Sequence, residues 1–362
     1  MWKRIGVLLS MLVLCGCESV ELEERSFPLA VGVDLQSAEE SKEKDRKMVV
    51  SFDFPDFTQI SEKGKTTDTP MGMSLEGADM YHVEKSYENN TNRLLDYNHM
   101  KAVVLGTDLL KNQKKLCSFL LAWEQQEDSA RNINLFLGDS AAEILSLTEE
   151  TEGSMGKYLE EMLESQKDFR QKKIATLGNL MNQWHNQDEL LLIPLLTDQG
   201  NRPAVTGYGA LLNFEYCGDL TVEEAMEIFL CQNLLRKFTC ELSESEVVEI
   251  SELQVSVSVE EAEHVPVVSV SVSGKGRLMT GRSSSAAQQY RMEQNIEKRL
   301  TSDLQETAEK LRQEYGIDMT NSYISLGGLN RKLYRTYQGR QELYNQKAQH
   351  VFKVDIDLLN WE

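Results

Sequence analysis

The clearest pattern of apolar and polar positions lies in the C-terminal half of the chain. Apolar residues alternate with Gln and Ser from Leu253 to Val259, and with Ser again from Val268 to Val272. A period of two places every second side chain on the same face of a strand. The pattern therefore predicts two half-buried strands that form an antiparallel hairpin across the acidic segment 260–264.

A helical period follows this hairpin. Ser283–Ser285 can cap a long helix, and Gly316 stands where a left-handed stop is expected. The apolar stripe between them consists of Ile296, Leu300, Leu304, Ala308, Leu311 and Tyr315. The segment Val351–Leu359 returns to a period of two, which predicts a strand whose solvent-exposed face carries Lys353, Asp355 and Asp357.

Shorter apolar runs predict the remaining elements. The predicted strands are Phe27–Asp34, Met48–Phe54, Met100–Gly106, Ile133–Leu137, Leu190–Leu196, Ala204–Phe214 and Tyr323–Leu329. The predicted helices are Met73–Leu95, Leu109–Trp123, Ser140–Leu147 and Thr221–Phe238, with a loop at 58–70 and a solvated connector with a helix at 149–173. The fold class is α+β, a multi-domain mixed α/β chain with antiparallel sheets and long amphipathic helices.

The N-terminus has the layout of a secretory signal. Lys3 and Arg4 precede an apolar run from Ile5 to Leu14, and Leu14, Cys15, Gly16 and Cys17 then resemble a bacterial lipobox. In that motif the Cys17 thiol takes a diacylglycerol and becomes the new N-terminus, while Cys15 is a small filler that is removed with residues 1–16. A CxC metal or redox pair is the alternative, but the sequence places no further ligand close by.

Lipidation of Cys17 would anchor the chain to membrane lipid. The apolar run Ile5–Leu14 is too short for a spanning helix, and no other segment approaches the roughly 18 consecutive apolar residues that such a helix needs. We therefore expect a lipoprotein on the outer face of the cell membrane. The regions expected are a signal peptide at 1–16, an N-terminal α/β region at 17–200 and a C-terminal α+β region at 201–362, which can divide again near 240–285.

Charge and cysteine content narrow the function further. The 362 residues carry a formal charge of −20, and removal of Lys3 and Arg4 with the signal would leave −22. Such a body repels phosphate, which argues against binding to nucleic acid or to anionic lipid surfaces. The cysteines after Cys17 are too few for a disulfide framework, and the sequence leaves open one incidental disulfide among Cys217, Cys231 and Cys240.

Candidate chemistry is sparse. Asp355 and Asp357 mimic a DxD metal motif, but their alternation with a buried face favours a solvated strand surface. Gly207 and Gly209 begin a GxG pattern, yet Leu212 stands where a dinucleotide fingerprint needs its third glycine. His264 lies among Glu260, Glu261 and Glu263 in a loop, and the remaining histidines, His82, His99, His185 and His350, are isolated in the sequence. We therefore predict no catalytic, cofactor-binding or metal residue, and no enzyme.

Four sequence blocks in order resemble the Ger(x)C family, the C-subunit lipoproteins of spore germination receptors. They are ELEERSFPLAVGVDL at Glu21–Leu35, NRLLDYNHMKAVVLGTDLL at Asn92–Leu110, GYGALLNFEYCGDLTVEEAMEI at Gly207–Ile228 and LRQEYGIDMTNSYISLGGLNRKLY at Leu311–Tyr334. The chain departs from the family pattern at Glu18 and Ser19, where Trp and Asp are common, and at Tyr334 or Tyr337, where a Trp is usual. It therefore resembles a divergent member.

The resemblance implies a three-domain α+β protein tethered to the inner spore membrane. It also implies integral-membrane germinant receptor subunits as partners, one of them transporter-like, in a complex that senses nutrients, and no enzymatic activity. A solute-binding lipoprotein of a membrane transporter is the alternative function, but that class needs two repeated α/β lobes. A secreted hydrolase would need a polar catalytic cluster that the sequence does not contain.

Overall fold

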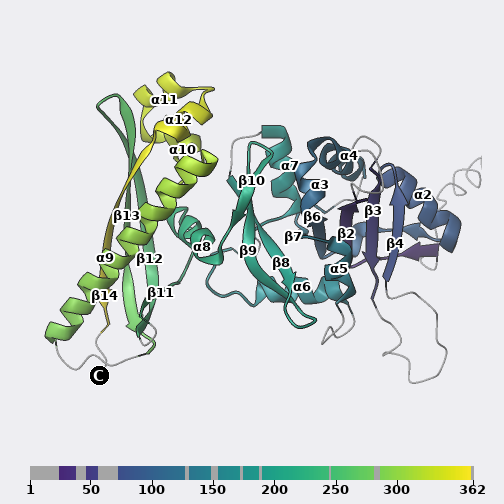
Figure 1. Cartoon of the computed structure of the whole chain (residues 1–362), viewed down its shortest axis with the longest axis horizontal. Coiled ribbons are helices and arrows are strands. Elements are labelled where there is room, and N and C mark those ends of the chain that lie inside the picture. Colours follow the sequence, from purple (N-terminus) through teal and green to yellow (C-terminus); the bar gives the residue numbers. More distant parts are fainter. Residues whose placement is uncertain are drawn as a thin grey trace, which may run out of the picture.

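The computed structural model describes residues 24–37, 46–55, 72–126, 130–147, 154–171, 174–186, 190–243, 246–280 and 286–359. The lipobox residues Leu14, Cys15, Gly16 and Cys17, the predicted loop 58–70 and the capping serines 283–285 lie outside these ranges. The molecule is elongated (Figure 1). A large mixed sheet with its helices occupies one end, and a second sheet with one long helix occupies the other.

The larger sheet has eight strands in the order β10-β9-β8-β7-β6-β2-β3-β4. These are β2 (Ala30–Leu35), β3 (Met48–Asp53), β4 (Gly72–Gly77), β6 (Ala102–Gly106), β7 (Asn134–Gly138), β8 (Leu190–Asp198), β9 (Pro203–Leu212) and β10 (Glu215–Leu220). The central strands β2, β6, β7 and β8 pair in parallel, and antiparallel strands flank them. Every residue of β6 and β7 is buried, as expected for parallel strands covered on both faces.

Helices cover both faces of this sheet. One apolar core lies under α2 (Met80–Thr91), α3 (Thr107–Lys111), α4 (Gln113–Glu124) and α7 (Leu177–Asn186), and a second lies under α5 (Ala141–Ser146) and α6 (Met155–Glu164). A parallel ribbon joins β1 (Arg25–Ser26) to β5 (Leu94–Leu95), just before the 3-10 turn η4 (Tyr97–His99). The succession β6, α3, α4, β7, α5 follows the order of the strands and helices predicted between residues 100 and 147.

The second sheet has four strands in the order β11-β12-β13-β14. They are β11 (Phe238–Ser243), β12 (Glu246–Ala262), β13 (Val265–Leu278) and β14 (Gln349–Leu358). Between β13 and β14 the chain forms α9 (Ala286–Lys310), the π-helical turn η5 (Leu311–Tyr315), α10 (Ser322–Leu329), α11 (Arg331–Tyr337) and α12 (Gln341–Lys347). α8 (Val222–Cys231) lies between the two sheets (Figure 1), and one apolar cluster runs from β8 and β9 through α8 into the second sheet.

The outer edge of β14 is covered by side chains of α9. Glu293 and Glu297 accept hydrogen bonds from the backbone N–H groups of Leu358 (3.0 Å) and Ile356 (3.4 Å). The Gln289 amide donates to the Leu358 carbonyl at 2.7 Å. These side chains occupy backbone groups that a further strand would otherwise pair with.

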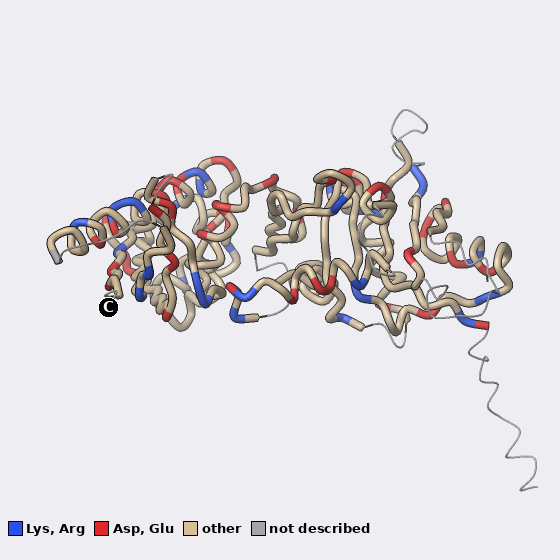
Figure 2. The backbone as a smooth tube through the Cα atoms, turned by 90° about the horizontal axis from the view of Figure 1, so that it is seen from below, with Lys and Arg blue, Asp and Glu red and all other residues tan. Residues whose placement is uncertain are grey.

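Acidic and basic residues are interspersed at both ends of the molecule (Figure 2). The excess of acidic residues behind the net charge of −20 is therefore not confined to one segment. Within the described ranges, no helix combines the length and the apolar character needed to cross a membrane.

The patterns with the longest regular period are confirmed. β12 and β13 form the predicted antiparallel hairpin, and they extend further than the alternation indicated. Its turn is shorter than the predicted segment 260–264, because the positive φ angles of 51° at Glu263 and 67° at His264 make a two-residue turn. The α9 stripe is buried at Ile296, Leu300 and Leu304, and Gly316 ends the helical run with φ 65°.

Three predicted elements are wrong in type or extent. The predicted helix Met73–Leu95 begins as strand β4, and α2 starts only after Asp79, whose side chain accepts from the His82 N–H at 3.1 Å. The predicted strand Tyr323–Leu329 is helix α10, because a short apolar run fits a buried helix as well as a strand. The predicted helix Thr221–Phe238 ends at Cys231, and β11 begins at Phe238.

Two further predictions need a smaller correction. The predicted helix Leu109–Trp123 is divided at Asn112, whose side chain caps α4 by accepting from the Lys115 N–H. The connector 149–173 contains α6, and this helix packs Leu159 and Leu163 into the core instead of lying in solvent. Residue 200, the last of the expected N-terminal region, lies in the turn between β8 and β9.

Candidate functional site

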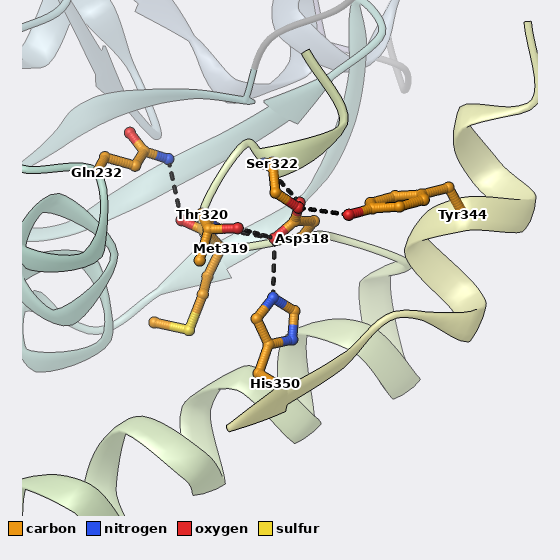
Figure 3. Close-up of polar contacts among 7 residues, drawn as sticks. All are labelled: Gln232, Asp318, Met319, Thr320, Ser322, Tyr344 and His350. Carbon is orange, nitrogen blue, oxygen red and sulfur yellow. Dashed lines mark hydrogen bonds and ion pairs between the residues drawn. The ribbon is translucent and has the colours of Figure 1, made fainter. Parts of the chain in front are cut away.

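A fully buried acid–histidine pair lies at the end of the second sheet. Asp318 follows η5 in the loop before α10, and His350 is the second residue of β14. Asp318 Oδ1 and His350 Nε2 are 2.9 Å apart, and the two side chains are only 3% and 2% exposed (Figure 3). Charged or polar side chains at this depth need partners on the protein itself.

Asp318 receives further hydrogen bonds from the start of α10. Thr320 donates to Oδ1 from its backbone N–H at 2.9 Å and from its hydroxyl at 2.6 Å. Ser322 donates to Oδ2 from its N–H at 2.7 Å and from its hydroxyl at 2.6 Å, and the Ser322 hydroxyl also lies 2.7 Å from the Tyr344 hydroxyl. One carboxylate therefore joins the loop, α10, α12 and β14.

The same loop is tied to the helix between the two sheets. The Gln232 amide, just after α8, donates to the Met319 carbonyl at 3.2 Å (Figure 3). The network therefore also fixes the C-terminal end of α8.

The electrostatic state of this network follows from its contacts. Burial alone would raise the pKa of Asp318, but the hydrogen bond and charge of His350, with the hydrogen bonds from Ser322 and Thr320, lower it well below its usual value. Burial, and then the charge of Asp318, raises the pKa of the Tyr344 phenol. Asp318 is therefore an ionised acceptor surrounded by neutral donors and one imidazole.

The residue types match a hydrolase triad, but the arrangement does not. A triad needs the nucleophile to contact the histidine, which the acid then orients. Here Ser322 and His350 both contact Asp318, and the Ser322 hydroxyl lies against Tyr344 instead of the imidazole. The network lies inside the protein and holds elements together, so we interpret it as structural.

The predicted candidates lie apart from this network, with one exception. Asp355 and Asp357 are exposed on the outer face of β14, and His264 is 99% exposed at the tip of the hairpin. Gly207 and Gly209 are inside β9 and open no phosphate loop. His350 is the exception: it has no companion near it in the sequence, but the fold brings it against Asp318, which is 32 residues away.

Glu261, three residues before His264 in the hairpin, forms an ion pair. Glu261 pairs with Lys332 of α11 at 2.6 Å, so this acidic side chain links the hairpin to the helices.

Among the described residues, no three His, Cys, Asp or Glu side chains come close enough to hold a metal ion. The four cysteines that the structure describes, Cys117, Cys217, Cys231 and Cys240, are free thiols, so the disulfide left open among the last three is not formed.

Two carboxylates anchor helices to the larger sheet. Asp34, at the end of β2, accepts from the N–H groups of Ala141 (2.8 Å) and Ala142 (2.9 Å) at the start of α5. Its place beside the next strand leaves no room for a side chain at Gly106, where an added Cβ would lie 2.3 Å from Asp34 Oδ1. Burial raises the pKa of Asp34 and these N–H groups oppose the shift.

Asp53 does the same for α6. It accepts from the Ser154 hydroxyl at 2.7 Å and from the Gly156 N–H at 2.8 Å. Gly156 is pressed against the backbone of Leu29, where an added Cβ would lie 2.4 Å from the carbonyl carbon. Both carboxylates thus occupy helix N-termini, where negative charge is stabilising.

Comparison with known proteins shows which family the chain matches. Residues 18–198 match the family described as spore germination protein N-terminal domain, and residues 209–359 match spore germination B3/GerAC like, C-terminal. The chain belongs to the Ger(x)C family of spore germination proteins. No curated protein sequence matches it.

The fold of the family is also present. The crystal structure of the GerBC protein superposes with a TM-score of 0.59 at 15% identity, and the match covers 92% of this chain and 98% of the GerBC chain. At this low identity the likeness shows the mixed α/β fold. The sequence blocks that resemble the family contain Asp34 and Asp318, two carboxylates that join distant elements of this chain.

Proposed function

We propose that this protein is a non-enzymatic lipoprotein subunit of a nutrient germinant receptor in the spore inner membrane, required for spore germination. The observation that carries the proposal is the pair of family matches over residues 18–198 and 209–359. Two features support it: the GerBC-like fold, and the Leu14–Cys17 lipobox that ends just before the first match. The partners proposed are membrane lipid through acylated Cys17 and the integral-membrane subunits of the receptor.

The fold weighs against the solute-binding alternative. That class needs two repeated α/β lobes, whereas this chain has an eight-stranded mixed sheet and a four-stranded sheet with different strand orders. The buried network at Asp318 likewise places no nucleophile in contact with its histidine, since the Ser322 hydroxyl and His350 both contact Asp318. A role in binding and assembly is therefore the proposal that the geometry supports best.

An anchor at Cys17 would orient the molecule. Arg25 follows Cys17 by eight residues, which span at most about 28 Å when fully extended. Arg25 is docked through β1 and through an ion pair with Asp96 at 2.6 Å. The end that carries α2 and β4 would therefore face the membrane, with the four-stranded sheet directed away from it (Figure 1).

The receptor role is tested by deletion of the gene in its host. Loss of the spore response to at least one nutrient is expected, because the receptor would lack a subunit. Unchanged germination with every nutrient would refute the proposed role.

The anchor is tested separately with two single substitutions in the lipobox. Cys17→Ala should abolish incorporation of labelled palmitate and release the protein from the membrane fraction, since no acceptor thiol remains. Cys15→Ala is the matched control and should behave as wild type, because its position tolerates small residues. Palmitate labelling of Cys17→Ala at the wild-type level would exclude this anchor.

A further inference from the structure

A cavity of about 600 Å³ lies between α8, β11 and α9 in the C-terminal part of the molecule. Its apolar walls are formed by Val222 and Met226 of α8, Phe238 of β11 and Leu300 of α9. A space of this size accepts a small organic molecule and presents both apolar and charged surface to it. The cavity is separate from the Asp318 network.

Most of the charged residues that line the cavity are acidic. Seven carboxylates and two cations contribute to the lining. The carboxylates are Glu223, Glu224 and Glu227 from α8, Asp303 and Glu306 from α9, Glu241 from β11, and Asp168. Both cations are already engaged, because Arg299 pairs with Asp303 and Lys310 pairs with Glu224.

One of these carboxylates is buried without a full set of partners. Glu227 is only 8% exposed, and its Oε2 atom finds no hydrogen-bond donor among the described residues. Burial raises the pKa of Glu227 to about 7, while a hydrogen bond with Thr307 opposes the shift. A buried acceptor without a donor is costly, so this position favours a ligand that brings N–H groups and positive charge.

We propose that this cavity binds a small organic cation with two protonated amines, one of which donates to Glu227 Oε2. Two amines suit the spread of carboxylates over three elements, and the methylene chain between them suits the Val222, Met226 and Leu300 walls. A metal ion fits less well, since the described side chains supply no cluster of three ligands. A zwitterion would place its own carboxylate among the acidic residues. The proposal is independent of the germination role.

The test is a calorimetric titration of the purified full-length protein with 1,5-diaminopentane at pH 7 and low salt. Saturable binding to the wild type is expected. Glu227→Gln keeps the shape of the side chain and should weaken binding at least tenfold, because it removes the buried charge. Asp357→Asn removes the same charge from the exposed face of β14 and should bind like wild type.

Two further ligands test the chemistry. 1,5-Pentanediol and 5-aminopentanoate have matching chain lengths but lack one or both cationic ends, and each should bind at least tenfold more weakly than the diamine. Three results would each overturn the proposal: no binding of the diamine to wild type, equal binding to Glu227→Gln, or equal binding of the diol.

A second variant covers the case in which Glu227→Gln does not fold. Glu223 and Glu306 line the cavity from exposed positions, so a protein with both Glu223→Gln and Glu306→Gln should fold normally. It should bind the diamine several-fold more weakly than wild type, since two wall charges are lost. Unchanged affinity in this double variant would also overturn the proposal.

Discussion

Replacement of Asp318 by Asn should destabilise the C-terminal part of the protein severely. The two side chains have nearly the same shape, but the amide keeps one acceptor oxygen and turns an NH₂ group toward donors. If the NH₂ replaces Oδ2, the Ser322 N–H and hydroxyl lose their acceptor, and if it replaces Oδ1, Thr320 and His350 lose theirs. In either orientation at least one backbone N–H is left unpaired at a fully buried site.

The expected size of the effect follows from these lost contacts. A buried donor left without its acceptor costs about 1–3 kcal/mol, and disruption of a buried charged pair costs roughly 3–5 kcal/mol. The hydroxyl groups can rotate to other acceptors, whereas backbone N–H groups cannot. We therefore expect the free energy of unfolding to fall by about 3–5 kcal/mol.

The assay combines urea unfolding with hydrogen exchange of the peptide that contains the Thr320 and Ser322 amides. Exchange at these amides should accelerate in Asp318→Asn, while amides of the larger sheet should keep their protection. Asp357→Asn is the control, since it makes the same chemical change on an exposed strand face. A loss of less than about 1 kcal/mol, or a loss equal to that of the control, would refute the reasoning.

The pH dependence of the same variant gives an independent check. The pKa of Asp318 in the folded protein lies below its ordinary value of 3.8, so the stability that its ionised form contributes is present above pH 3.8 and is lost as the pH falls toward the folded-state pKa. The difference between wild type and Asp318→Asn should therefore be constant near neutral pH and shrink below pH 3.8. A difference that grows on acidification would contradict the ionised state.

Three further outcomes are expected. Gly156→Ala should lower the free energy of unfolding by about 1–3 kcal/mol, because the added Cβ would meet the backbone just before β2. Gly328→Ala is the control and should leave the free energy of unfolding unchanged, since a Cβ added there meets nothing. Urea unfolding of both variants tests the difference. The raised pKa of Glu227 predicts that the free energy of unfolding falls as the pH rises from 4.5 to about 7, because the folded state holds the proton more tightly than the unfolded state. Glu227→Gln should remove this pH dependence in thermal melts. An unchanged pH dependence would contradict the burial argument. The half-buried Cys217 should react with a thiol reagent before the fully buried Cys231, because burial limits access to Cys231 and raises the pKa of its thiol. Mass spectrometry of the labelled peptides gives the order of reaction, and earlier labelling of Cys231 would contradict the prediction.

The accuracy of the sequence-based prediction depended on how local each signal was. The hairpin of β12 and β13 and the helix α9 were predicted because a long uninterrupted period specifies both the element and its buried face. α10 was mistaken for a strand because eight residues with Gly327 and Gly328 contain too few turns to display a helical period. The start of α2 was missed because it depends on a single cap at Asp79.

The candidate site was harder to predict for a related reason. Asp318 and His350 are 32 residues apart, and each looks ordinary in its own segment, so nothing local indicates that they meet. Asp34 appears in the sequence only as the last residue of a predicted strand, because its partners in α5 are more than 100 residues away. Neither the periodicity of the chain nor a local motif predicts these long-range contacts.

The parallel pairing of β14 with β13 has a consequence for the order of folding. About 70 residues separate β14, the strand that completes the second sheet, from its neighbour β13. α9 must already lie alongside before Glu293 and Glu297 can cover the edge of β14. The second sheet therefore closes through a contact between residues far apart in the sequence, and until β14 pairs, β13 presents an open edge that other chains could join.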